Sequence, residues 1–507
     1  MGKVARRIVI AVAVLVVMLF VASFAIDRIM LDRTFSRVVS EDPGFMPSEE
    51  YMADYKSTPV EFQLDGQTLR GSVYEADNPR AFIVFRHGIF SQHCDYLALI
   101  SAMVDRGCTV FAYDALGCGI SDGNSTFGMA QSAIDVAAAV QHVRDQGLVG
   151  DLPLVLWGHS WGGYGVAAAM DIVPDVDACI TMSGYNAPVE VLVDTASTRM
   201  GPVAATQRPT LWLVNKMTFG EHADRTALDG INKTSAPVLV VHGTEDEVVR
   251  YDVSSIISQR DLVTNPNVEY LVFDEEDHNG HNTYFYSEEA NGYLDEKKTE
   301  LKQIEAQYPE GVPTDVMATF MNGYDQHRGN IANPKLINAI DVFITKAIGG
   351  DVKATDPSQY GALQSARYTN SGNSLGNRYE LEAMRADDGS LIVVEREAEM
   401  HSMPTTVREF RADADLLDRI AAIVDEADMK EWGDLPLTEF IAYDASTPSL
   451  TLTFDNANAS EKWPVWLSVS TSNVLPDDGK SLYAIRDLLD SYVSDANLIR
   501  QYEEPLR

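Results

Sequence analysis

The residues best suited to catalysis in this 507-residue chain are the five from Gly158 to Gly162, which read Gly-His-Ser-Trp-Gly. They fit the G-x-S-x-G pattern, in which a nucleophilic serine sits on a sharp turn between a strand and a helix. Chance alone gives this pattern about 0.1–0.2 times in a chain of this length. The context strengthens it, because an apolar strand is predicted at 154–157 and a helix of small residues at 163–170. We therefore predict that Ser160 is a nucleophile.

With this turn, the chain resembles the α/β-hydrolase superfamily and, within it, the serine-aminopeptidase-like and monoacylglycerol-lipase-like serine hydrolases. The resemblance covers about residues 60–350. It implies an α/β-hydrolase fold, in which a mostly parallel sheet is flanked by helices and a cap lies over the site. It also implies a triad in the chain order Ser, Asp, His.

The acid of the implied triad follows a predicted strand at 237–241. The segment from His242 to Asp246 reads His-Gly-Thr-Glu-Asp. In the family, an H-G-x-x-D segment at the end of such a strand carries the triad acid, which gives Asp246 this role. Glu245 is the alternative acid.

The base follows the next predicted strand, at 270–273. Residues 277–282 read Asp-His-Asn-Gly-His-Asn, and the family usually has Gly-His-Asn or a close variant here, which selects His281. His278 is the rival. A neutral imidazole can take the serine proton near pH 7, and a carboxylate then fixes its tautomer and stabilises the imidazolium.

The oxyanion formed during acyl transfer needs hydrogen-bond donors. Residues 86–90, Arg-His-Gly-Ile-Phe, follow the strand predicted at 81–85. The family places one backbone N–H donor just after such a His-Gly pair, at Ile89, and the second just after the nucleophile, at Trp161. His87 is expected to be structural.

The elements that must position these residues alternate along the chain. An antiparallel hairpin is predicted between Val60 and Val73, and a last helix is capped by Asn333 and closed by Gly349. Short apolar runs separated by helices predict a parallel sheet covered on both faces. The runs are 81–85, 109–113, 152–157, 178–182 and 237–241.

A cap is predicted at about residues 185–234, where the chain leaves the sheet. Its apolar side chains, such as Leu192, Trp212 and Phe219, suit a hydrophobic ester, although some must pack the cap on the core. A peptidase of this group needs an acid that holds a free amine. The candidate acids are Glu190, Glu221 and Asp224.

The N-terminal region has the pattern of a membrane anchor. Lys3, Arg6 and Arg7 precede an apolar run from Ile8 to Ile26 that is interrupted by Ser23. At about 1.5 Å per residue, this run spans a bilayer core of about 30 Å. The alternative, a cleaved signal peptide, usually has an apolar region of about 7–15 residues. We predict an uncleaved signal anchor of a single-pass cell-membrane protein, with an extracytoplasmic catalytic domain.

Residues 27–58 are predicted to form a linker that sets the distance between the catalytic domain and the membrane. The chain has 39 Lys and Arg against 75 Asp and Glu, a net charge of -36. Such a charge excludes nucleic acid as a natural partner. It also predicts that the domain stands off from anionic lipid.

The sequence pattern changes after Gly350. This change predicts a separate α+β domain, with helices near 416–424 and 482–493. No catalytic constellation is found in it. The chain is therefore predicted to consist of a cytoplasmic tail (1–7), a transmembrane anchor (8–26), a linker (27–58), the hydrolase domain (59–350), a second linker (351–375) and the C-terminal domain (376–507).

The four cysteines, Cys94, Cys108, Cys118 and Cys179, fit either packing roles or one disulfide. Neither they nor the nearby histidines have the spacing of a compact metal site, so no metal or cofactor is expected. The sequence predicts a serine hydrolase of a lipid or other hydrophobic carboxylic ester. An aminopeptidase or amidase, an acyltransferase and a catalytically inactive binding protein on the same fold remain alternatives.

Overall fold

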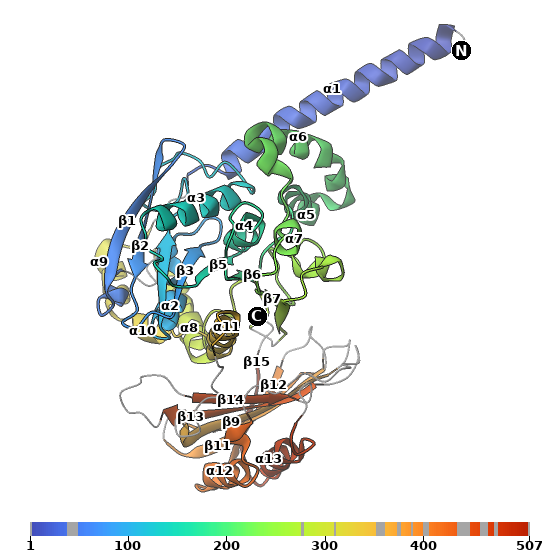
Figure 1. Cartoon of the computed structure of the whole chain (residues 1–507). Coiled ribbons are helices and arrows are strands. Elements are labelled where there is room, and N and C mark those ends of the chain that lie inside the picture. The colour runs from blue at the N-terminus through green and yellow to red at the C-terminus, as the bar shows by residue number, and fades with distance from the viewer. Residues whose placement is uncertain are drawn as a thin grey trace. The chain divides into compact units, whose positions relative to one another are not determined.

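The computed structural model folds into two compact units, Met1–Asp351 and Val352–Arg507 (Figure 1). The predictions for residues 1–2 of the tail, 38–48 of the first linker, and 351–359 and 373–375 of the second lie outside the described residues. The structure describes residues 3–37, 49–274, 278–308, 311–350, 360–372, 377–386, 389–398, 405–432, 447–456, 465–470 and 475–504.

The first unit is built on an eight-stranded sheet in the order β1-β2-β4-β3-β5-β6-β7-β8. The predicted hairpin is confirmed as β1 and β2, and the strands from β3 to β8 run parallel to one another. This is the predicted α/β-hydrolase fold. The strands are Ser57–Leu64, Gln67–Tyr74, Ala81–Arg86, Cys108–Tyr113, Leu154–His159, Ala178–Met182, Val238–Gly243 and Val268–Phe273.

Helices cover both faces of this sheet (Figure 1). Helices α3 (Gln131–Asp145) and α4 (Trp161–Ala169) pack on one face, and α2 (Leu97–Val104) and α11 (Pro334–Ala347) pack on the other. The five strands from β3 to β7 are buried along their whole length, which explains their continuous apolar sequences. Asn333 caps α11 through the N–H of Lys335, as the sequence predicts.

The cap consists of α5 (Pro188–Met200), η3 (Gly201–Gln207), α6 (Arg208–Phe219), η4 (Gly220–Asp224) and α7 (Ala227–Asn232). A further group of helices separates β8 from α11 and has its own small apolar core. These helices are α8 (Glu288–Gln307), α9 (Thr314–Asn322) and α10 (Gln326–Gly329).

The N-terminal helix α1 (Lys3–Thr34) is longer than the predicted span. It is the one helix of the described residues that is long and apolar enough to cross a membrane, and its most apolar stretch of 18 residues has a mean hydropathy of 3.1. Residues 27–34, predicted as the start of a linker, continue the helix. The reason is tertiary, since Asp27 and Leu31 pack against the cap and not against water.

The second unit is the predicted α+β domain. Its seven-stranded sheet has the order β14-β13-β9-β10-β11-β12-β15, and every pair of neighbours is antiparallel. Helices α12 (Leu416–Glu426) and α13 (Lys480–Asp490) cover one apolar face of it. The strands are Tyr360–Gly372, Asn377–Arg385, Leu391–Ala398, Thr405–Arg411, Thr447–Asn456, Val465–Ser470 and Leu498–Glu504. Strand β9 occupies part of the predicted second linker, because it pairs with both β10 and β13.

Candidate active site

Ser160 occupies the turn between β5 and α4, at the carboxyl edge of the sheet. Its backbone is strained, with φ of 56° and ψ of -113°, a conformation that is rare for a residue with a side chain. The flanking glycines are steric requirements. A Cβ on Gly158 would lie 2.3 Å from the carbonyl oxygen of Gly162, and one on Gly162 would lie 2.0 Å from that of Arg86. The residues of the pattern are therefore those that the turn needs.

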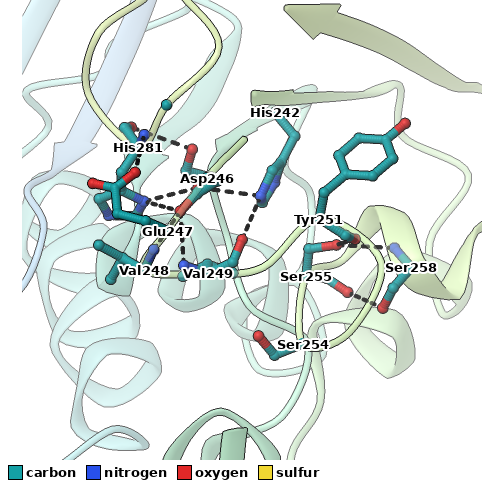
Figure 2. Close-up of polar contacts among 12 residues, drawn as sticks. His242, Asp246, Glu247, Val248, Val249, Tyr251, Ser254, Ser255, Ser258 and His281 are labelled. Atoms are coloured by element: carbon teal, nitrogen blue, oxygen red, sulfur yellow. Dashed lines mark hydrogen bonds and ion pairs between the residues drawn. The ribbon is translucent and has the colours of Figure 1, made fainter. Parts of the chain in front are cut away.

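Asp246 and His281 come from two different loops, and their side chains meet (Figure 2). The Nδ1 atom of His281 lies 2.9 and 2.8 Å from the two carboxylate oxygens of Asp246. An ionised carboxylate only accepts hydrogen bonds, so Nδ1 carries the proton and Nε2 is left able to accept one. The His281 ring centroid lies 4.8 Å from that of His159, the neighbour of Ser160 in sequence.

Asp246 is buried and held as a carboxylate. The backbone N–H groups of Val248 and Val249 donate to its Oδ1 at 2.9 and 2.7 Å. Burial by itself would raise the pKa of Asp246, but the hydrogen bonds from His242 and His281 outweigh it and hold the pKa well below its usual range. The carboxylate therefore stays ionised at neutral pH.

The two alternative residues occupy less suitable positions. Glu245 is exposed, whereas Asp246 is 3% exposed. His278 is half-buried and precedes His281 by three residues in the same loop. The contact between His281 and Asp246 thus favours the assignment of these two residues.

A second histidine on Asp246 was not identified from the sequence. The Nε2 atom of His242, at the end of β7, lies 3.2 Å from Oδ2 of Asp246 and 2.8 Å from the carbonyl oxygen of Val249 (Figure 2). Both neighbours are acceptors, so Nε2 carries a proton and donates. The His-Gly-Thr-Glu-Asp segment contained the signal, because a histidine four residues before the acid lies at the same strand end. His242 is a positioning residue for Asp246.

We expect His242→Leu to lower kcat by tenfold or more, since a hydrogen bond to a charged group is worth about 1.5–3 kcal/mol. His242→Gln keeps a donor of similar reach and should retain most of the activity. Steady-state ester hydrolysis by the two variants, both checked for folding by circular dichroism, measures the difference. Equal activity of the two variants would contradict the positioning role.

His159 and Tyr96 connect the loops around Ser160. The N–H of Gly88 donates to the Tyr96 hydroxyl at 3.1 Å, and that hydroxyl donates to Nδ1 of His159 at 2.8 Å. Nε2 of His159 then donates to the carbonyl oxygen of His281 at 3.2 Å. Burial, and secondarily the charge of His281, lowers the pKa of His159 well below its usual value, which keeps its ring neutral. One chain of hydrogen bonds therefore links the loops of Gly88, Ser160 and His281.

The predicted oxyanion donors flank Ser160. Trp161 is the first residue of α4, so its N–H has no partner within the helix. The N–H of Ile89 has no acceptor among the described residues. A Cβ built on Gly88 would lie 3.4 Å from Cβ of Ser160, which places the Gly88–Ile89 peptide beside the nucleophile.

His87 fixes the orientation of that peptide. Its Nε2 accepts the N–H of Ala115 at 2.9 Å, so its Nδ1 donates to the Gly88 carbonyl oxygen, 2.6 Å away. The C=O and the following N–H of a trans peptide point in opposite directions. By holding the Gly88 oxygen, His87 therefore turns the Ile89 N–H away from itself, which agrees with the structural role predicted for His87.

A buried ion pair supports the loop next to this site. Nδ1 of His93 lies 2.7 Å from Oδ1 of Asp114, and both residues are at most 2% exposed. Burial alone would lower the pKa of His93, but the hydrogen bond and charge of Asp114 outweigh it and raise the pKa to about 10. The pKa of Asp114 is lowered in return, so the pair is charged at neutral pH.

Because the pKa of His93 is raised to about 10 in the folded state, its stabilisation is complete below the unfolded value near 6.5. It is lost as the pH rises toward about 10. We expect the Tm of the full chain to fall across this window, and to fall less steeply in His93→Gln. Thermal unfolding at a series of pH values checks this, and identical slopes would contradict it.

The acids weighed as amine-holding groups are engaged at the surface of the cap. Glu190 pairs with Arg208 at 2.7 Å, and Asp224 pairs with Lys216. The Glu221 side chain is 83% exposed. The acid that the cap does bury, Asp194, is neutralised by Arg250 and accepts a hydrogen bond from Ser254 at 2.7 Å.

The four cysteines are free thiols, of which three are buried and Cys94 is half-buried. Burial raises the pKa of the Cys108 thiol to about 11, which makes it unreactive. Among the described residues, no group of three His, Cys, Asp or Glu side chains is placed to hold a metal ion.

The chain is similar to known hydrolases. Residues 77–222 match the model of the family described as serine aminopeptidase, S33. The matched region includes Ser160 and both predicted oxyanion donors and ends before Asp246. The chain is 25% identical over 243 residues to "Uncharacterized protein YfhR" of Escherichia coli (strain K12), covering 46% of this chain and 78% of that protein.

Other similarities cover smaller parts or are structural. The chain is 28% identical over 179 residues to human "Alpha/beta hydrolase domain-containing protein 17C", which covers 35% of this chain and 47% of that protein. It is also similar to the structure of the Pyrococcus furiosus esterase Pf2001, with 17% identity and a TM-score of 0.38. That match covers 54% of this chain and 96% of the esterase.

Proposed function

We propose that this α/β-hydrolase is a membrane-anchored serine hydrolase that cleaves hydrophobic carboxylic esters through an acyl-enzyme. The observation that carries the proposal is the contact of His281 with the buried carboxylate of Asp246, beside a serine held in a strained turn. Strain of this kind is concentrated at functional sites, where it exposes the nucleophile.

In the proposed reaction, the Ser160 hydroxyl oxygen attacks the ester carbonyl carbon while its proton passes to Nε2 of His281. The N–H groups of Ile89 and Trp161 stabilise the oxyanion. When the tetrahedral intermediate collapses, the C–O bond to the alcohol breaks and His281 gives its proton to the departing oxygen. Water, activated by the same imidazole, then hydrolyses the acyl-enzyme and releases the acid and free Ser160.

The cap supports an ester over a peptide with a free amino terminus. An aminopeptidase needs an unpaired acid in the site, but the cap acids Glu190, Asp224 and Asp194 are each paired with a cation, and the Glu221 side chain is 83% exposed. The apolar side chains of the cap suit an acyl chain.

A fluorophosphonate probe tests the proposal on the purified full-length chain. We expect covalent labelling of Ser160 and turnover of p-nitrophenyl esters, with aminoacyl anilides hydrolysed far more slowly. Transfer of the acyl group to an added alcohol or amine would identify an acyltransferase. If the folded chain is neither labelled nor active, the binding-protein alternative replaces the proposal.

The continuity of α1 supports a retained anchor. The helix runs without interruption from Lys3 to Thr34, and its last turns are part of the folded unit through Asp27 and Leu31. Cleavage near Ala25 would cut this helix within its contact with the cap.

Protease treatment of intact cells or spheroplasts tests the orientation. We expect digestion of the catalytic domain while the N-terminus stays protected in the membrane fraction. Protection of the domain until the membrane is lysed would reverse the orientation. A soluble mature protein beginning near Ile26 would show that the segment is a cleaved signal.

A further inference from the structure

The C-terminal end of α1 is joined to the cap by a row of side chains on one face of the helix. Residues 4–22 are exposed, whereas Ser23, Asp27 and Leu31, spaced four apart, are covered. Ser23 donates to Gln207, and the Thr210 hydroxyl donates to Asp27. We call the contact of Ser23, Asp27, Arg28 and Leu31 with α5 and α6 the anchor–cap contact.

Two further contacts join α1 to the cap helices α5 and α6. The Arg28 guanidinium donates to Thr218 at 3.2 Å, and Leu31 packs with Val193 and Leu211. Helix α6 therefore lies along α1, with its first residues near Ser23 and its last turn near Arg28, and Figure 1 shows α1 extending away from the unit past α6.

The chain beyond α1 is also attached, so the unit cannot swing about this end. The carbonyl oxygen of Phe35 accepts the N–H of Thr126 at 2.8 Å. The Arg37 guanidinium donates to three carbonyl oxygens of the loop from Gly119 to Gly123, at 2.7–2.9 Å. Residues 23–37 thus form one docked segment.

This docked segment overlaps the membrane span. The apolar run ends at Ile26, whereas the cap contacts begin at Ser23. Three residues of helix are about 5 Å. If α1 crosses a bilayer, Gln207 and Thr210 must therefore lie at the depth of the lipid headgroups, and the domain cannot stand off from the membrane as its net charge alone would predict.

The part of the cap at this depth has the composition of a membrane contact. Residues 199–208, here called the cap edge, contain no acidic residue, in a chain with 75 acidic residues, and carry two exposed arginines, Arg199 and Arg208, of which Arg208 pairs with Glu190. Met200 and Val203 of the cap edge are 48% and 59% exposed. Apolar side chains beside arginines suit the boundary between acyl chains and phosphate groups.

We propose that the cap edge lies in the headgroup layer of the bilayer that α1 crosses, and that the enzyme draws its ester substrate from that leaflet. This rests on the proposed function and narrows its substrate class to esters carried by membrane lipid. The anchor–cap contact holds the cap, which leaves the sheet after β6 at the same edge as Ser160, at the lipid surface.

A depth measurement tests the location without depending on catalysis. Full-length Val203→Cys, in a Cys94→Ala background, is labelled with an environment-sensitive fluorophore in vesicles of phosphatidylcholine and phosphatidylglycerol. We expect blue-shifted emission that is quenched by bromine-substituted lipid. Leu148→Cys is the matched control, because Leu148 is exposed but precedes β5, at the opposite edge of the sheet from Ser160. Equal, water-like emission at both positions overturns the proposal.

A kinetic experiment tests the substrate route. A flexible Gly-Ser insertion of about 12 residues between Ala22 and Ser23, preceded by four added leucines that restore the length of the apolar run, lets the unit move about 20 Å from the bilayer. We expect hydrolysis of a vesicle-embedded ester to fall about tenfold relative to a water-soluble ester, because the effective concentration of the cap at the surface falls. The same insertion at the exposed Asp65-Gly66 turn of β1 and β2 should leave this ratio unchanged.

The outcomes separate the two proposals. A parent chain that turns over neither ester contradicts the proposed function, while the fluorophore depth still decides the location of the cap edge. An active parent whose insertion variant keeps the original ratio overturns the membrane route alone. If the insertion variant loses both activities, the fluorophore decides: water-like emission from Val203→Cys also overturns the membrane route.

Discussion

Replacing Ser160 with alanine is expected to lower kcat for ester hydrolysis by about four to six orders of magnitude and to abolish fluorophosphonate labelling. In the proposed reaction this residue supplies the oxygen that forms the acyl-enzyme, so its loss leaves only binding and oxyanion stabilisation. Stopped assays at high enzyme concentration, together with mass spectrometry of the labelled protein, measure both effects.

Ser132→Ala is the matched control for this change. Ser132 is buried in α3 against Gly165 of the helix that follows the nucleophile, and its hydroxyl has no hydrogen-bond partner among the described residues. We expect this variant to keep wild-type turnover and labelling. Substantial activity in Ser160→Ala, or its loss in Ser132→Ala, would show that the chemistry is carried elsewhere.

His281→Ala should lower kcat by a similar factor, because removal of the base leaves the serine proton in place and gives the leaving group no proton. His278→Ala should keep most of the activity, since the contact with Asp246 is made by His281. The two histidines are three residues apart in one loop. A general disturbance of that loop would therefore lower the activity of both variants, and not of one alone. The reverse result would reassign the base.

The acid side of the pair gives an independent check. Asp246→Asn would present an amide to His281, favour the wrong tautomer and lower kcat by about 10^4. Glu245→Gln changes an exposed residue next in sequence and should leave kcat close to the wild-type value. If instead Glu245→Gln were the damaging change, the assignment of the acid would be wrong.

The sequence by itself determined the elements and the order of the chemical groups along them. Local patterns were sufficient because apolar runs of five or six residues specify strands that are buried on both faces. The glycines around Ser160 were informative for a related reason, since the strand-to-helix turn leaves no space for side chains there. The same holds for Asn333, whose capping bond to Lys335 is local.

Choosing between neighbouring candidates required the tertiary structure. Asp246 and Glu245, or His281 and His278, differ little in local sequence, and burial and contact separate them only once β7 and β8 are paired. The role of His242 and the link between Tyr96 and His159 were missed for the same reason. A hydrogen bond between residues far apart in sequence leaves no periodic pattern behind.

The N-terminal helix shows most clearly what the sequence determined and what the tertiary structure decided. Hydropathy determined that residues 8–26 can span a bilayer, because that property depends on composition and length alone. It gave no sign that Ser23, Asp27 and Leu31 face a cap nearly two hundred residues later, since a polar residue at the end of a span is equally consistent with solvation. Only the folded chain, in which Thr210 and Leu211 receive that face of the helix, decided that the last turns of α1 are part of the folded unit.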